Sequence, residues 1–234
     1  MKIAIIPARS GSKSLIDKNI LLLDGKPLLV HSIECALQSE LFDEVFISTD
    51  SQQYADIAKQ YGGSVPFLRD TTLAGDDSYI WDAVRGDLLK YEAVGKQFET
   101  VVLLQPTSPL RVPEDIKTAY QIYEDNKADS VISVCKASYS PLIHNTLPKN
   151  NSLKEFLKYE TFSKPRQQLS DFYRVNGAIY IVRYCCPERN MDLYGEKSYA
   201  YIMPKERSVD IDDRWDFIMA EALYMNLKSR KEGL

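Results

Sequence analysis

The sequence predicts an α/β fold in which a mostly parallel sheet lies between two layers of helices. Apolar β-type runs alternate with segments of helical periodicity along most of the chain, and this alternation favours parallel strands joined by helices. The first apolar run ends directly in a polar turn, as strands do at the edge of an open α/β sheet where ligands bind. The length of 234 residues suits one domain with a substantial core. We therefore expect a single domain, residues 1–234.

The predicted strands are runs rich in β-branched and other apolar residues. They cover residues 3–6, 44–49, 65–68, 99–104, 129–136, 176–182 and 199–203. The run at 99–104 has the strongest strand character. Two prolines fix the turn beyond its carboxyl end, which aims Gln105 toward the loop that follows the first strand.

The predicted helices lie between and after these strands, at about residues 27–39, 52–61, 79–91, 113–126 and 215–230. Pro27 and Pro113 suit the first turns of their helices, because no amide hydrogen is needed there. In the first helix, the spacing of apolar residues predicts that His31 and Glu34 face outward. We expect Asp50 to cap the second helix.

Composition excludes several classes of protein. The net charge of −4 gives no sign of polyanion binding, so nucleic acid is not an expected partner. No apolar run approaches the roughly 20 residues of a membrane helix, and Arg9 interrupts the amino-terminal run that a signal peptide would need. We therefore expect a cytoplasmic protein with no membrane partner. The four cysteines show no metal spacing, which predicts reduced thiols.

The turn after the first strand concentrates cationic and small residues, namely Arg9, Ser10, Gly11, Ser12, Lys13, Lys18 and Asn19. Glycine and serine expose backbone N–H groups to an anion, and arginine and lysine add charges that match phosphate oxygens. The spacing is neither that of a Walker loop nor GxGxxG. We expect a cradle for a nucleoside triphosphate, with a solvated surface loop as the alternative.

Two aspartates alternate near the end of the chain, Asp210 and Asp212, with Ile211 between them. On an extended strand, residues two apart point to the same side, about 6.5 to 7 Å apart, so the carboxylates would face one way and Ile211 the core. Adjacent carboxylates repel unless a cation intervenes, and Mg²⁺ is commonly held by carboxylates plus substrate phosphates. The pair therefore predicts a Mg²⁺ site. The alternative is that Asp212 or Asp213 caps the last helix.

The opening loop, Pro7 to Lys13 followed by Lys18 and Asn19, resembles the signature loop of the acylneuraminate cytidylyltransferases, the CMP-sialic acid synthetases. Further blocks resemble the same family, namely Arg69 with the following Leu-Ala-x-Asp, QPTSPLR at 105–111, KPRQQL at 164–169, RVNGAIY at 174–180 and the paired aspartates. The resemblance covers nearly the whole chain. It implies a Rossmann-like three-layer sandwich and an enzyme that uses Mg²⁺ and joins CMP to a nine-carbon sugar acid.

The resemblance also assigns roles to individual residues. The nucleotide would be bound by Ala8, Arg9, Ser10, Gly11, Ser12, Lys13, Asn19, Arg69 and Ser78, the last two at the cytosine base. The sugar acid would be bound by Gln105, Arg166, Gln168 and Asn176, with Arg166 on the carboxylate. Arg9, Lys18, Asp210 and Asp212 would be catalytic, and the two aspartates would hold the metal.

Some of these positions have alternatives or depart from the family. Arg166 could instead form a salt bridge at a dimer surface, and Ser78 could belong to a helix cap. Ile80 stands where relatives commonly carry a small hydroxyl residue, so Ser78 or backbone groups would have to replace that contact.

The regular alternation breaks between residues 137 and 172, where prolines and asparagines punctuate a stretch with no clean period. An unpatterned stretch this long inside a compact domain indicates a special role. In the family that the chain resembles, the matching region projects from the core and forms the dimer contact. The resemblance therefore implies a homodimer with a dimerisation excursion at 137–172.

Together these features predict a cytidylyltransferase that couples CTP to a nine-carbon 2-keto sugar acid, N-acetylneuraminate or a close analogue, with release of pyrophosphate. The alternatives are a CMP-legionaminate, CMP-pseudaminate or CMP-KDO synthetase, a glycosyltransferase that uses Asp-x-Asp, and a non-catalytic nucleotide-binding module. No histidine stands out as a general base, so metal-assisted ionisation of the attacking hydroxyl is expected. The central expectation is that Arg9 and Asp210 open onto one shared site.

Overall fold

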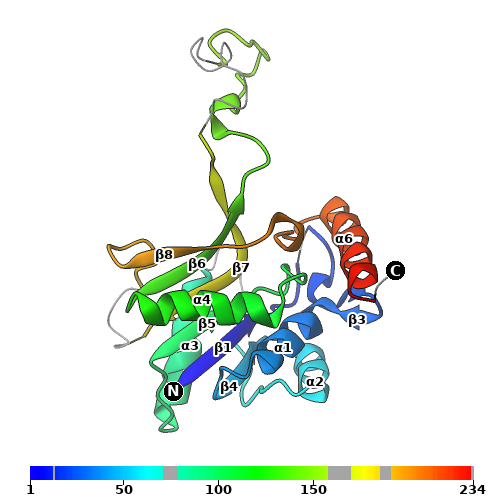
Figure 1. The fold of residues 1–234 in the computed structure, drawn as a ribbon. Helices are drawn as coiled ribbons and strands as arrows, with labels where there is room; N and C mark the ends of the chain where they lie inside the picture. Colours follow the sequence, from blue (N-terminus) through cyan, green and yellow to red (C-terminus); the bar gives the residue numbers. More distant parts are fainter. Residues whose placement is uncertain (13, 71–78, 158–169, 185–190, 233–234) are drawn as a thin grey trace.

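The computed structural model describes residues 1–12, 14–70, 79–157, 170–184 and 191–232. It confirms the α/β class, with a six-stranded sheet and helices on both of its faces (Figure 1). The sheet contains β1 (Lys2–Pro7), β4 (Glu44–Ser48), β5 (Thr100–Leu103), β6 (Ser130–Lys136), β7 (Tyr173–Arg183) and β8 (Ser198–Ile202). A small ribbon pairs β2 (Leu22–Leu23) with β3 (Lys26–Pro27). The α-helices are α1 (Leu28–Ser39), α2 (Gln52–Gln60), α3 (Ile80–Ala93), α4 (Pro113–Asp125) and α6 (Arg214–Glu232).

The strand order is β4-β1-β5-β7-β6-β8. β1 pairs in parallel with β4 and β5, and β6 pairs in parallel with β8. β7 runs antiparallel to both of its neighbours. The chain goes from β1 to β4 on one side and later returns to β5 on the other, so the carboxyl end of β1 lies at a topological switch point. Ligands bind in the crevice at such a point.

Each face of the sheet contributes to a separate layer of the core. In β1, Ala4 and Ile6 lie in the layer that α1, α2 and α4 supply, whereas Ile3 and Ile5 lie in the layer that α3 supplies. All four side chains are completely buried, which explains why this strand has no polar face in the sequence. A third cluster packs α6 onto Ile211 and Leu28, next to the carboxyl end of the sheet.

Two local predictions were wrong. Residues 65–68 do not form a strand. Instead a single parallel bridge joins Phe46 to Ser64, because Pro66 has no amide hydrogen to donate to a ladder. His31 does not face outward. Its Nε2 lies 2.9 Å from the carbonyl oxygen of Leu23, and its ring meets that of Tyr224 in α6 with 5.5 Å between centroids.

Between β6 and β7 the chain leaves the body of the sheet. Figure 1 shows this segment standing away from the core beyond the paired ends of the two strands. Its described part includes a short 3-10 helix, Pro141–Ile143. The break in the sequence pattern therefore corresponds to a projection. Across the described ranges, no helix is long and apolar enough to cross a membrane.

Candidate functional site

The loop after β1 begins at the switch point and is held there by β4. The amide of Ala8 donates to the carbonyl oxygen of Ser48 at 2.9 Å. Beyond it, Gly11 adopts a φ of +72°, a backbone conformation that favours glycine. The loop thus leaves the sheet beside the end of β4.

Asp50 fixes the conformation of this loop and does not cap α2 as predicted. Its carboxylate accepts bonds from the amide and the hydroxyl of Ser10, each at 2.7 Å, while Ser51 is the helix cap. Burial acts to raise the pKa of Asp50, but the bonds from Ser10 outweigh it and the pKa is lowered, so the carboxylate stays ionised. Asn19 likewise donates to the carbonyl oxygen of Arg9 at 3.0 Å. In this conformation Ser10 and Asn19 shape the loop.

Lys18 joins the loop to the acidic segment near the end of the chain. Its Nζ donates to the carbonyl oxygen of Ile211 at 2.7 Å and lies 3.5 Å from Oδ1 of Asp212. The Lys18 side chain is 12% exposed and that of Asp212 is 82% exposed. The loop near the start of the sequence and the acidic segment near its end therefore meet beyond the carboxyl end of β1.

The acidic segment lacks the strand geometry that we predicted. It pairs instead with the turn after β5, since the amide of Ile211 donates to the carbonyl oxygen of Thr107 at 2.9 Å. Ile211 is completely buried, as expected. Asp213 caps α6, because its Oδ1 accepts bonds from the amides of Trp215 at 2.7 Å and Asp216 at 3.0 Å. The capping alternative is therefore confirmed for one of the three aspartates.

Asp210 lies in a largely buried position. Within the described part of the chain, its Oδ1 is buried and has no hydrogen-bond partner. Burial raises the pKa of Asp210, a hydrogen bond with Thr107 lowers it and the charge of Asp212 raises it, so that the pKa lies above the usual value. The charges of Lys18 and Arg174 also lower the pKa of Asp210, but they do not offset its burial.

Gln105 and Asp210 converge over Gly177 in β7. A methyl group placed on Gly177 would lie 2.8 Å from Oε1 of Gln105 and 3.1 Å from Oδ2 of Asp210. Gly177 also has a φ of +75°. The turn after β5 and the acidic segment therefore approach each other at Gly177, where a side chain would collide with both.

The two acids fit a hard divalent cation. Asp210 supplies a buried oxygen with no hydrogen-bond partner among the described residues. Asp212, two positions later, supplies an exposed carboxylate whose charge acts on Asp210. No group of three or more His, Cys, Asp or Glu residues that could hold a metal occurs in the ranges that the structure describes. A cation here would depend on two carboxylates and on the oxygens of a bound phosphate, which is the ligand set that suits Mg²⁺.

Arg69 contacts the end of β4 and is only 5% exposed. Its Nε donates to Oγ of Ser48 at 2.9 Å and its Nη2 to the carbonyl oxygen of Ser48 at 3.0 Å. Burial lowers the pKa of Arg69, while Asp87 and Asp50 raise it and Arg9 lowers it. The charges of Arg9 and Arg69 are thus close enough to interact, and both residues lie near the carboxyl ends of the strands.

Asn176 has a different surrounding from the one we expected. It is completely buried, and its Oδ1 accepts bonds from the hydroxyl of Ser133 at 2.6 Å and the amide of Ala178 at 3.2 Å. Its Nδ2 donates to Oγ of Ser208 at 2.9 Å. In this conformation Asn176 holds β7 to the acidic segment.

Four predicted site residues fall outside the described ranges, namely Lys13, Ser78, Arg166 and Gln168. Conversely, our sequence reasoning missed Asp50, Thr107 and Gly177. Only Gly177 left a usable signal, because a glycine inside a strand often marks a close approach to another group.

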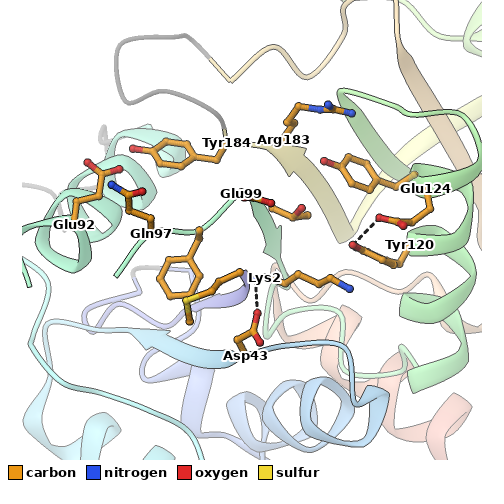
Figure 2. Close-up of a pocket in the computed structure, with 13 residues that line it drawn as sticks. Lys2, Asp43, Glu92, Gln97, Glu99, Tyr120, Glu124, Arg183 and Tyr184 are labelled. Carbon is orange, nitrogen blue, oxygen red and sulfur yellow. Dashed lines mark hydrogen bonds between the residues drawn. The ribbon is translucent and has the colours of Figure 1, made fainter. Parts of the chain in front are cut away.

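An open cavity of about 1110 Å³ lies at the opposite ends of the strands, next to the first residues of β1 and β5. Figure 2 shows Lys2, at the start of β1, among its lining residues. Two of its carboxylates already have protein partners, since the amide of Lys2 donates to Asp43 at 2.6 Å and the hydroxyl of Tyr120 donates to Glu124 at 2.8 Å. Open α/β sheets bind ligands at the carboxyl ends of their strands. We therefore place the candidate site beyond the carboxyl end of β1 and not in this cavity.

Comparisons with known proteins identify the family of the chain. Residues 3–200 match the family model described as Cytidylyltransferase. The chain is 39% identical over 224 residues to a CMP-N,N'-diacetyllegionaminic acid synthase from Legionella pneumophila, an alignment that covers 94% of this chain and 95% of that protein. It is 40% identical over 234 residues to an N-acylneuraminate cytidylyltransferase from Escherichia coli, covering 99% of this chain and 54% of that protein.

The chain therefore spans about half the length of the N-acylneuraminate cytidylyltransferases that it matches. Among solved structures, a CMP:2-keto-3-deoxy-manno-octonic acid synthetase complexed with CTP superposes with a TM-score of 0.67 at 19% identity, covering 96% of this chain and 98% of that one. At that identity, the likeness shows a shared fold.

Proposed function

The chain belongs to the cytidylyltransferase family, and from this we propose that it forms a CMP-sugar from CTP and a nine-carbon 2-keto sugar acid. The observation that carries the proposal is the contact of Lys18 with the segment of Asp210 and Asp212. It joins a loop suited to phosphates with carboxylates suited to a metal. N-acetylneuraminate is the first candidate acceptor. N,N'-diacetyllegionaminate is the second, because the Legionella relative matches over nearly its whole length.

In the proposed reaction, the anomeric hydroxyl of the sugar acid attacks the α-phosphorus of CTP. The hydroxyl loses its proton to solvent, and a new bond forms between its oxygen and the α-phosphorus. The bond from the α-phosphorus to the oxygen that bridges it to the β-phosphate breaks, and pyrophosphate leaves. Such a transfer depends mainly on positioning and on stabilising charge. Arg9 and Lys18 would contact the phosphates, and Lys18 is already oriented by the carbonyl oxygen of Ile211.

Asp210 and Asp212 would hold Mg²⁺ in this scheme. When bound, Mg²⁺ would polarise the α-phosphate and favour ionisation of the attacking hydroxyl. The buried Oδ1 of Asp210, which has no protein partner in the described part of the chain, supports this assignment. Gln105 would contact the sugar from the same space, since its side chain meets Asp210 over Gly177.

We also propose that the projection between β6 and β7 forms a homodimer contact. In its described part, Tyr139, Leu142, Leu147 and Leu153 are 48 to 67% exposed, although such side chains are usually buried. Covering them with a second copy would remove apolar surface from water. Sedimentation equilibrium tests this point. A dimer that becomes a monomer in Leu147→Ser/Leu153→Ser supports it, and a wild-type monomer contradicts it.

The proposed activity is tested by pyrophosphate release with Mg²⁺, each of four nucleoside triphosphates and a panel of 2-keto sugar acids. We expect release with CTP and a nine-carbon acid, and mass spectrometry should identify the CMP-sugar. Comparison of N-acetylneuraminate, N,N'-diacetyllegionaminate, pseudaminate and KDO ranks the acceptors by kcat/KM. Binding of CTP without pyrophosphate release from any acid would instead favour a non-catalytic nucleotide-binding module.

A further inference from the structure

The segment from Ser208 to Asp213, which carries the two acids, contains no helix or strand. A metal site nevertheless requires its ligands to be held in one geometry, and groups that orient the ligands commonly tune metal affinity. Contacts with other parts of the chain must therefore hold the backbone of this segment in place. The contacts at its two ends show what does so.

Asp115 in α4 and Arg207 form a partly buried ion pair immediately before the segment. The carboxylate of Asp115 is completely buried and accepts bonds from Nε of Arg207 at 3.0 Å and Nη2 at 2.7 Å. Such a paired contact fixes the angle as well as the distance of a guanidinium. The same carboxylate accepts bonds from the hydroxyl of Tyr201 in β8 at 2.6 Å and the amide of Val112 at 2.9 Å. Asp115 therefore connects α4 and β8 to the segment.

The next residue, Ser208, is also fixed. Its Oγ accepts a bond from Nδ2 of Asn176 at 2.9 Å and donates to the carbonyl oxygen of Pro204 at 2.7 Å. Its carbonyl oxygen accepts a bond from Nη2 of Arg174 at 2.8 Å. With Ile211 tied to Thr107 and Lys18, the backbone is held on both sides of Asp210.

We propose that Asp115 and Arg207 are positioning residues that fix the acidic segment so that Asp210 and Asp212 can bind the divalent cation together. The inference depends on the proposed function. Within the described ranges, no hydrogen bond holds Oδ1 of Asp210, so the placement of this atom depends strongly on the backbone on either side. Arg207 lies three positions from Asp210, outside the contacts proposed for substrate and metal.

The test measures metal affinity directly. Mn²⁺ replaces Mg²⁺, and its dissociation constant is measured by electron paramagnetic resonance in the presence of α,β-methylene-CTP. We expect Arg207→Gln to weaken Mn²⁺ binding about tenfold, the lower end of the range for groups that orient metal ligands. Arg207→Lys, which keeps the charge but not the paired geometry, should recover part of the loss.

Two further variants separate positioning from general stability. Arg183→Gln breaks a more exposed ion pair with Asp129, 3.4 Å long, at the carboxyl end of β7, and should leave the Mn²⁺ constant unchanged. Because Arg207→Gln leaves a buried carboxylate without its cation and can lower stability, Tyr201→Phe provides a milder change. It removes one hydrogen bond from Asp115 without altering charge, and it should weaken Mn²⁺ binding by a smaller factor.

The inference is overturned if Arg207→Gln, folded by circular dichroism, and Tyr201→Phe both bind Mn²⁺ as tightly as the wild type. If Arg207→Gln does not fold, the Tyr201→Phe constant decides alone. A wild-type chain that binds CTP but no Mn²⁺ would instead refute the proposed metal site, and this inference with it.

Discussion

Replacement of Gly177 by alanine should damage the site far more than it damages the fold. The added methyl group would lie 2.8 Å from Oε1 of Gln105 and 3.1 Å from Oδ2 of Asp210, both closer than carbon and oxygen normally approach. Either the two side chains move or β7 moves. In addition, a φ of +75° costs a residue with a side chain about 1 to 2 kcal/mol.

We therefore expect the free energy of unfolding of Gly177→Ala to fall by about 1 to 2 kcal/mol from the backbone alone. A displacement near 1 Å at reacting groups can cost about 100-fold in rate, so kcat should fall by about that factor. Urea unfolding and steady-state pyrophosphate release measure the two effects separately.

Gly95→Ala provides the matched control. Gly95 has a φ of +81° and no atom within 4 Å of an added methyl group, so this variant should lose similar stability while keeping wild-type kcat. If Gly177→Ala retains wild-type kcat, or if Gly95→Ala loses as much activity, then Gln105 and Asp210 do not form the site over Gly177.

Three further predictions concern the acids, the loop and pH. Asp212→Asn should keep its fold by circular dichroism but lose more than about 100-fold in kcat, beyond the range typical of residues that only orient metal ligands; wild-type turnover at saturating Mg²⁺ would remove Asp212 from the metal site. Asp50→Ala deprives Ser10 of both bonds at 2.7 Å and should raise KM for CTP about tenfold, or about 1.4 kcal/mol; an unchanged KM would show that Asp50 does not order the loop for nucleotide binding. Burial lowers the pKa of His31 in the folded chain. Just below pH 6.5 the unfolded chain therefore binds more protons than the folded chain. The free energy of unfolding should fall as the pH decreases from about 6.5 toward the pKa of the folded chain. His31→Gln should reduce that slope in urea titrations between pH 5 and 7.5, and an identical slope would contradict the assignment to His31.

Much of the fold follows from local patterns in the sequence. The run Ile3 to Ile6 is apolar at every position because both faces of β1 are covered, and a buried parallel strand has this pattern in general. The helices α1 and α4 begin next to Pro27 and at Pro113, where proline marks a start. The cationic loop was predicted from its composition, and the structure places it at the switch point.

The predictions that failed depend on contacts between distant segments. His31 is buried because α6, almost 200 residues later, packs over α1. Asp50 could serve as a helix cap by its position, but Ser10, 40 residues earlier, takes its carboxylate. The acidic segment extends along the turn at Thr107 rather than along a strand. None of these pairings has a local signature, so periodicity and spacing cannot reveal them.

The most direct test of the shared site is a crystal structure of the chain with Mn²⁺ and α,β-methylene-CTP, in which anomalous scattering locates the metal. We predict a metal peak bound by Asp210, Asp212 and an α-phosphate oxygen, with the remaining phosphates on Arg9 and Lys18. A triphosphate held away from the loop after β1, or a metal bound at neither aspartate, would contradict the account.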